Sequence, residues 1–125
     1  MGEHIPILRY LAMHHGYYPK DPVQAQQSED IVLGSSTSLG KIAAIVFTPD
    51  QAAKAGMIED VFTNILPKYL KAIDSHFTAH KFLVSDELSW ADFYLGGNLY
   101  LNCAKNPMIY APERWAELLD QFPNF

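Results

Sequence analysis

The chain has 125 residues, the usual length of one domain. Hydrophobic residues make up 49% of it and charged residues 18%, which supplies enough apolar side chain for a packed core and excludes a disordered chain. The net charge is −5 and no long cluster of Lys or Arg is present, so a nucleic-acid partner is not expected.

The single cysteine, Cys103, cannot form an internal disulfide, which fits a reducing compartment. The amino-terminal residues lack the basic start and apolar run of a secretory signal. Uninterrupted apolar runs extend over only a few residues, against the ~20 that a membrane-spanning helix needs. We therefore expect a soluble, cytoplasmic protein without a membrane partner.

A first helix is predicted close to the amino terminus. Residues 5–15 (IPILRYLAMHH) place apolar side chains three and four positions apart, and Pro6 is tolerated in a first helical turn. Gly16 follows as a stop signal. The pattern therefore indicates a short helix over residues 5–15.

A second and longer helix is predicted from Pro22 to about Thr48. Asp21 can cap its start, and Pro22 suits the first helical position. The Ser-rich stretch 34–38 has poor helix propensity, but apolar residues on both sides of it keep helical spacing. We favour one continuous helix, because two smaller domains would each bury too little surface.

The rest of the chain also shows helical periodicity. Apolar residues between 58 and 77 form a stripe, inside which Pro67 should kink the helix rather than end it. Residues 78–88 are expected to form a loop, and two more helices are expected at about 89–104 and 112–121. No segment alternates like a strand, so the predicted fold class is all-α, a helical bundle.

The start of the helix at residue 89 carries a specific signal. Ser89 can accept a bond from the Asp92 amide, while the Asp92 carboxylate reaches back to the Ser89 amide, which makes a capping box. Leu88 before the box and Phe93 inside the helix could add a hydrophobic staple. These residues are interpreted as structural, not catalytic.

The stretch FLVSDELSWAD at 82–92 closely resembles a motif in the C-terminal helical domain of glutathione transferases, where it precedes a buried central helix. ILRYLA at 7–12, GYYPKDPVQAQQSEDIV at 16–32, LPKYLKAID at 66–74 and WAELLDQFPNF at 115–125 also look like parts of that family, in the same order. The sigma, mu, pi and alpha branches fit best. The resemblance implies that residues 1–15 are the last helix of a thioredoxin-like domain that is otherwise missing, and that 16–125 form the helical domain.

The family conjugates glutathione, its co-substrate, to hydrophobic electrophiles, a reaction of detoxification and glutathione metabolism. Its thiol-activating residue lies in the thioredoxin-like domain, so the resemblance assigns no catalytic residue here and implies that this chain alone is inactive. It also implies a homodimer of the full-length form. No other cofactor is expected.

The resemblance also assigns binding positions. A Gln/Glu-Ser pair that holds the γ-glutamyl group of glutathione falls on Glu3 and His4, of which only Glu3 matches the family. An Asp that reaches glutathione across the dimer falls on Thr37, which lacks the charge. The implied pocket for the hydrophobic substrate consists of Gly40, Ala44 and Phe47.

Other features have plainer explanations. His76 and His80 have a metal-ligand spacing but no third ligand, and we expect no metal site. Gly96 and Gly97 suggest close contact between helices, and Cys103 a buried, inert thiol. A second function therefore stays open beside the enzyme: a non-catalytic scaffold or protein-interaction module of the same helical fold.

Overall fold

The computed structural model describes residues 3–100, 105 and 111–124. Within these ranges the regular structure is helical, with no strand, as predicted. The elements are α1 (His4–His15), α2 (Pro22–Phe47), α3 (Gln51–Asp60), the π-helical turn η1 (Val61–Ile65), α4 (Leu66–Phe77), α5 (Trp90–Asn98) and α6 (Pro112–Leu119).

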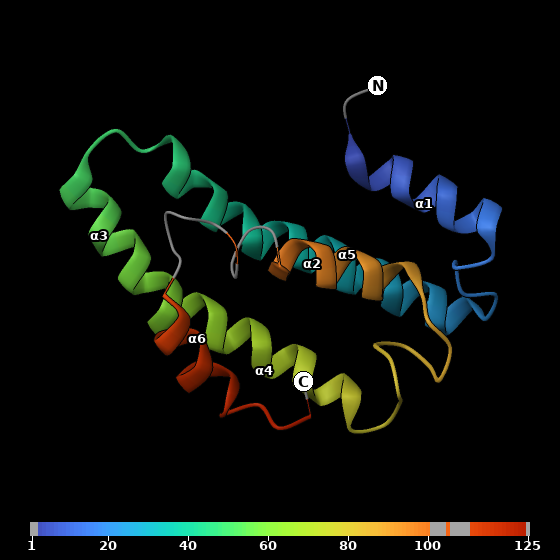
Figure 1. Ribbon diagram of the computed structural model, residues 1–125. Coiled ribbons are helices and arrows are strands. Elements are labelled where there is room, and N and C mark those ends of the chain that lie inside the picture. The colour runs from blue at the N-terminus through green and yellow to red at the C-terminus, as the bar shows by residue number, and fades with distance from the viewer. Residues whose placement is uncertain (1–2, 101–104, 106–110, 125) are drawn as a thin grey trace.

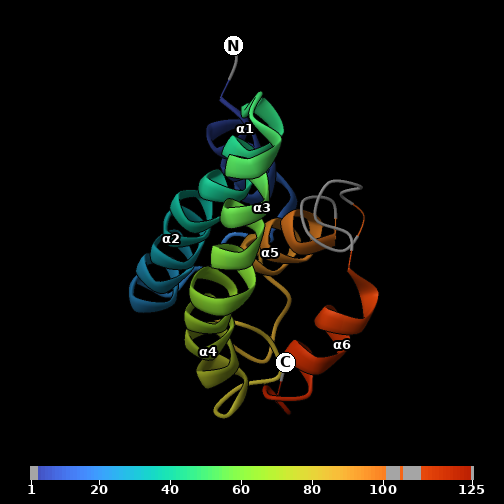
Figure 2. The same ribbon diagram turned by 90° about the vertical axis from the view of Figure 1, so that its left-hand side faces the viewer.

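The helices pack around α2 and α5, which lie against each other. The chain turns back after α2, so that α3, η1 and α4 run antiparallel to it, while α1 lies on the opposite side of α2 and α5 from α4 (Figure 1). Figure 2 shows α3, η1 and α4 following one continuous path, with α6 beside α4. The architecture is the all-α bundle that the periodicity predicts.

The first two helices begin and end close to the predicted residues. Gly16 ends α1 in the left-handed region with a φ of 82°, where a side chain would be strained. Asp21 caps α2 by accepting bonds from the amides of Val23 and Gln24. Continuous helix through the Ser-rich stretch is confirmed, since α2 extends unbroken from Pro22 to Phe47.

Two buried serines join α2 to neighbouring helices, Ser28 before its Ser-rich stretch and Ser35 within it. The hydroxyl of Ser28 donates to the Ala25 carbonyl and accepts from the Trp90 indole at 2.8 Å. Ser35 is equally buried and accepts from the Tyr69 hydroxyl at 2.8 Å. Packing on neighbouring helices therefore offsets the low propensity of this stretch.

The helix around Pro67 continues, as predicted, but its adjustment differs in kind. The chain keeps right-handed helical dihedrals at both ends of η1, and the Leu66 amide bonds the Val61 carbonyl one residue further back than in an α-helix. Proline lacks an amide hydrogen and crowds the preceding turn. A π turn directly before Pro67 absorbs that misfit, so the helix changes pitch there.

The capping box at α5 is present and holds more than the helix end. The Asp92 carboxylate accepts bonds from the amide and the hydroxyl of Ser89, each at 2.8 Å, and from the Leu83 amide at 3.0 Å. Of these bonds only the one from the Ser89 amide was predicted. The bonds from the Ser89 hydroxyl and from Leu83, in the preceding loop, were not. One carboxylate therefore fixes both the start of α5 and the return of loop 78–88.

Leu88 and Phe93, the pair predicted to form a hydrophobic staple, are both partly exposed. Leu88 is 39% exposed and Phe93 46% exposed. The Phe93 ring meets the Tyr17 ring edge-on, with centroids 5.0 Å apart. Phe93 therefore contacts the linker between α1 and α2.

The helix α5 ends at Asn98, and Cys103 lies outside the described residues.

A polar clamp joins α1 to the bundle. Arg9 forms two hydrogen bonds with Glu29, each 2.6 Å long, and its guanidinium lies over the Trp90 ring at 5.6 Å. The Tyr18 hydroxyl donates to the same carboxylate at 3.0 Å. Burial of Tyr18, and then its bond to Glu29, raises the pKa of the phenol above its ordinary value.

One feature of α2 differs from the expectation about membranes. Its 26 residues, with a mean hydropathy of 1.4 in the most apolar window, are long and apolar enough to span a bilayer. The short uninterrupted apolar runs did not predict this hydropathy, because small polar residues break the runs without making the helix polar overall. A single helix of this kind is weak evidence for a span, since the core helix of a soluble domain passes the same test.

The Asp92 carboxylate gives a first prediction. Asp92→Ala should lower the free energy of unfolding by about 2 kcal/mol or more, because it removes a cap and leaves two amides without their acceptor. Glu87→Ala, in the same loop and exposed, should change it by less than about 0.5 kcal/mol. Urea denaturation followed by circular dichroism measures both, and equal losses would contradict the assigned role of Asp92.

The clamp gives a second prediction, with a pH dependence. A tyrosine in the unfolded chain titrates near pH ~10, and the pKa of Tyr18 in the folded chain is higher. The contribution of Tyr18 to the free energy of unfolding should therefore be fully present below pH ~10 and be lost as the pH rises through the folded pKa. Tyr18→Phe should cost about 1–2 kcal/mol at neutral pH and flatten this alkaline decline. Tyr17→Phe is the matched control. An unchanged decline in Tyr18→Phe would show that another group causes it.

Candidate functional site

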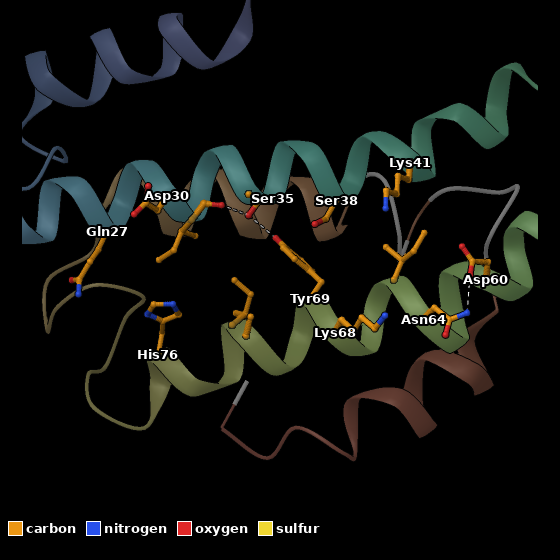
Figure 3. A pocket seen from close by; sticks show the side chains of 15 residues that line it. Gln27, Asp30, Ser35, Ser38, Lys41, Asp60, Asn64, Lys68, Tyr69 and His76 are labelled. Carbon is orange, nitrogen blue, oxygen red and sulfur yellow. Dashed lines mark hydrogen bonds between the residues drawn. The ribbon is translucent and has the colours of Figure 1, made fainter.

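A groove of about 720 Å³ lies between α2 and α4 (Figure 3). Its volume is in the range of small-molecule sites. The side chains that line it come from both arms of the antiparallel pair: Gln27, Asp30, Ile31, Gly34, Ser35, Ser38, Lys41, Asp60, Asn64, Ile65, Lys68, Tyr69, Ala72, Ile73 and His76.

The middle of the groove is apolar with one polar bridge. Ile31 and Ile73 are buried, and Tyr69 extends from α4 so that its hydroxyl meets Ser35 on α2 (Figure 3). This bond links α2 and α4 directly across the groove.

The two ends of the groove differ in charge. Lys41 and Lys68 lie toward one end, and Gln27 and His76 lie toward the other (Figure 3). Among the described residues neither lysine takes part in an ion pair. Asp60, near the lysines, is engaged by the Asn64 side chain at 2.7 Å. This end of the groove therefore carries two ammonium groups and one carboxylate.

The substrate-pocket residues predicted from the resemblance lie elsewhere on α2. Gly40, Ala44 and Phe47 are all exposed, Phe47 by 84%, and none of them lines the groove. Their spacing of four and three residues puts them on one face of the helix, so they do share a surface. The structure brings them together as an open apolar face without an enclosed cavity.

The remaining predicted positions are separated from one another. Thr37 lies on the same exposed face of α2, with its hydroxyl donating to the carbonyl of Leu33 in its own helix. Glu3 precedes α1 and caps it with no side-chain bond, while the His4 ring stacks on the Tyr94 ring with centroids 5.9 Å apart. His4 thus faces α5 rather than Thr37.

A smaller groove of about 390 Å³ lies between α1 and α5, and His4, Tyr94 and Gly97 are among its lining residues. A side chain added at Gly96 or Gly97 would meet nothing within 4 Å. The expectation of a close helix contact at these glycines is therefore wrong. The sequence offered no sign of this, because a glycine pair serves equally for close packing and for open surface.

Comparisons with known proteins agree with this architecture. The family model "Glutathione S-transferase, C-terminal domain" matches residues 38–125. The chain belongs to the glutathione S-transferase family. It is 30% identical over 121 residues to "Glutathione S-transferase P" of Capra hircus, covering 94% of this chain and 51% of that protein. It is 28% identical over 119 residues to "Hematopoietic prostaglandin D synthase" of Gallus gallus, covering 95% and 54%.

The family resemblance and the all-α fold predicted from sequence are thereby confirmed. The chain spans about half the length of these two relatives. The match covers the C-terminal helical domain of glutathione transferases, including residues 38–47 of α2 and the Asp92 box. The division at residue 15 into two domains stays a prediction.

The groove between α2 and α4 was not predicted. Its residues belong to two stripes of different helices, each of which indicates only that its helix is amphipathic. Lys41 and Lys68 are exposed residues beside these stripes, and nothing in the sequence shows that they line one groove. Within the described ranges no group of three His, Cys, Asp or Glu side chains could hold a metal ion, and His76 faces the groove.

Proposed function

We propose that this chain is the electrophile-binding and dimer-forming half of a glutathione transferase and that it does not conjugate glutathione alone. The family match supports the chemistry, since the relatives include a glutathione S-transferase. The observation that carries the proposal is the exposed face with Phe47 at its end, because so large an apolar ring in solvent is suited to a hydrophobic partner or substrate. Glutathione is the proposed co-substrate.

A second exposed apolar surface, on α1, supports the proposal that a thioredoxin-like domain packs against this chain. On α1 the side chains of Ile7, Tyr10, Leu11 and Met13 are 42–66% exposed. The helix is anchored to the bundle through Arg9 on its other side. A thioredoxin-like domain packed on the exposed side would supply the thiol-activating residue.

The proposed roles of individual residues follow from this arrangement. Glu3 would contact the γ-glutamyl group of glutathione, and Thr37 would make an uncharged and weaker contact across a dimer. Gly40, Ala44 and Phe47 would form the apolar wall for the electrophile. Phenylalanine adds no hydroxyl to assist the reaction, so Phe47 would contribute to binding alone.

One observation favours the alternative, a non-catalytic interaction module. The Thr37 hydroxyl is already bonded to its own helix, and the His4 ring is stacked on Tyr94, so neither side chain is poised for glutathione. The same exposed apolar faces would then bind a protein. Proposed localisation is cytoplasmic in either case.

The test uses two proteins: the chain as it stands, and the chain joined to the thioredoxin-like half of a glutathione transferase. Both are assayed for retention on immobilised glutathione and for conjugation of a chlorinated nitrobenzene. We expect no turnover by the chain alone and measurable turnover by the joined protein. Turnover by the chain alone would refute its inactivity, and a folded but inactive joined protein would favour the interaction module.

The joined protein also tests the apolar wall. Phe47→Ala should lower kcat/KM for the nitrobenzene on the order of tenfold through a raised KM, because it removes binding surface without touching the thiol. Val46→Ala is the matched control, since Val46 is a neighbouring apolar residue, also exposed, on a different side of α2. Equal effects of the two substitutions would remove Phe47 from the proposed pocket.

A further inference from the structure

We propose that Thr48, in the connector between α2 and α3, is a phosphorylation site for a proline-directed serine/threonine kinase, and that the phosphate frays the last turn of α2. The γ-phosphoryl group of ATP is transferred to Oγ1 of Thr48, ADP leaves, and the hydroxyl proton passes to the catalytic base of the kinase. This modification requires no glutathione, so it stands apart from the proposed conjugation.

The sequence around Thr48 has the pattern that such a kinase reads. Pro49 follows Thr48 directly, and among the eight prolines of the chain it is the one that follows a serine or threonine. Proline has a fixed φ and no amide hydrogen, so a binding cleft shaped for it distinguishes Thr48 from the other hydroxyl-bearing residues.

The connector presents Thr48 at one extremity of the molecule, where α2 gives way to α3 (Figure 1). Thr48 has extended backbone dihedrals, φ −79° and ψ 119°, as expected for a residue before proline. Extended segments are a form in which binding clefts take peptides. Thr48 is half-buried, while Pro49 and Asp50 after it are exposed, as are Val46 and Phe47 before it. A kinase can therefore reach this segment from the solvent.

The Thr48 side chain helps to close the end of α2. Its hydroxyl donates to the Ala44 carbonyl at 3.0 Å and lies 3.5 Å from the Met57 sulfur. The Thr48 amide bonds the Ile45 carbonyl at 3.3 Å. An ionised phosphate ester has acceptor oxygens in place of that hydroxyl. Phosphorylation thus removes the donor to Ala44 and places negative oxygens beside the last carbonyls of the helix.

The charges near Thr48 do not offset a phosphate. A phosphate carries about −1.5 to −2 charges at neutral pH, and the C-terminus of a helix has a partial negative charge. The last turn of α2 contains no basic residue. Asp50, two residues further on, is a carboxylate that caps α3 through the amides of Ala52 and Ala53. Repulsion should therefore open the last turn of α2 and move Phe47, while α3 keeps its cap.

The site is tested by incubating the purified chain with ATP and a proline-directed kinase of the mitogen-activated class. The conditions are those in which this kinase completely modifies a reference peptide containing Thr-Pro. Mass spectrometry of proteolytic fragments then locates the phosphate. We expect one phosphate per chain, on Thr48. An unmodified chain, or phosphate spread over other serines and threonines, would show that the proposal is wrong.

Two substitutions separate the acceptor from its recognition. Thr48→Val removes the hydroxyl and keeps the branched shape of the side chain, so it should abolish incorporation. Pro49→Ala keeps the hydroxyl and restores an amide hydrogen, so it should lower the initial rate of incorporation at least about tenfold. Circular dichroism checks that both variants fold. An unchanged rate in Pro49→Ala would refute the proline direction.

Thr63→Val is the matched control for the loss of a hydroxyl. Thr63 is exposed, and its hydroxyl donates to the Glu59 carbonyl four residues earlier, as that of Thr48 does to Ala44. It is followed by asparagine instead of proline. This variant should incorporate phosphate like the unaltered chain, and an equal loss in both threonine variants would contradict the assignment to Thr48.

Hydrogen exchange measures the effect on α2. In the phosphorylated chain the amides of residues 43–48 should exchange at least about tenfold faster than in the unmodified chain, and those of residues 22–33 should not change. Thr48→Glu and Thr48→Gln form a pair of similar shape that differs in charge. The Glu variant should melt about 2–4 °C lower than the Gln variant.

Unchanged exchange over residues 43–48 in a chain phosphorylated on Thr48 would contradict the fraying of α2. Equal melting temperatures of Thr48→Glu and Thr48→Gln would contradict the role of charge in it. None of these measurements contains glutathione, so their outcomes are independent of the conjugation tests.

Discussion

The Asp92 carboxylate is the constraint on which the arrangement of the helices depends. It accepts bonds from Ser89 at the start of α5 and from Leu83 in the preceding loop, so it sets where α5 begins and how the chain approaches it. The next residue after the cap is Trp90, which is fully buried. Fixing the cap therefore also fixes the position of the largest side chain in the core.

Trp90 is the point at which three helices meet. Its indole donates to Ser28 of α2, its ring lies beneath Arg9 of α1, and its backbone amide bonds the Tyr17 carbonyl in the linker between them. Arg9 is held in turn by Glu29 of α2. Burying a tryptophan supplies much apolar area, and partners for its one polar atom avoid the cost of an unpaired donor. The result is a rigid assembly of α1, α2 and α5.

This assembly determines which surfaces are left for function. α2 uses one side to pack on α5, so a second side can face α4 across the groove and a third side remains exposed. Across the groove, α4 reaches α2 through the hydrogen bond between Tyr69 and Ser35. The exposed side carries the residues that the glutathione transferase resemblance assigns to substrate binding. Two surfaces with different chemistry thus lie on one helix.

The sequence alone determined the local structure and the family. Helix caps at Asp21 and Ser89, the stop at Gly16 and the apolar stripes depend on interactions between residues a few positions apart, and these can be recognised without a fold. The motif around Asp92 is equally local, which is why the family could be recognised from it. Tertiary structure decided the rest, because the bond from Leu83 to Asp92, the partner of Phe93 and the placement of Lys41 and Lys68 along one groove depend on how whole helices pack. No periodicity within one helix carries that information.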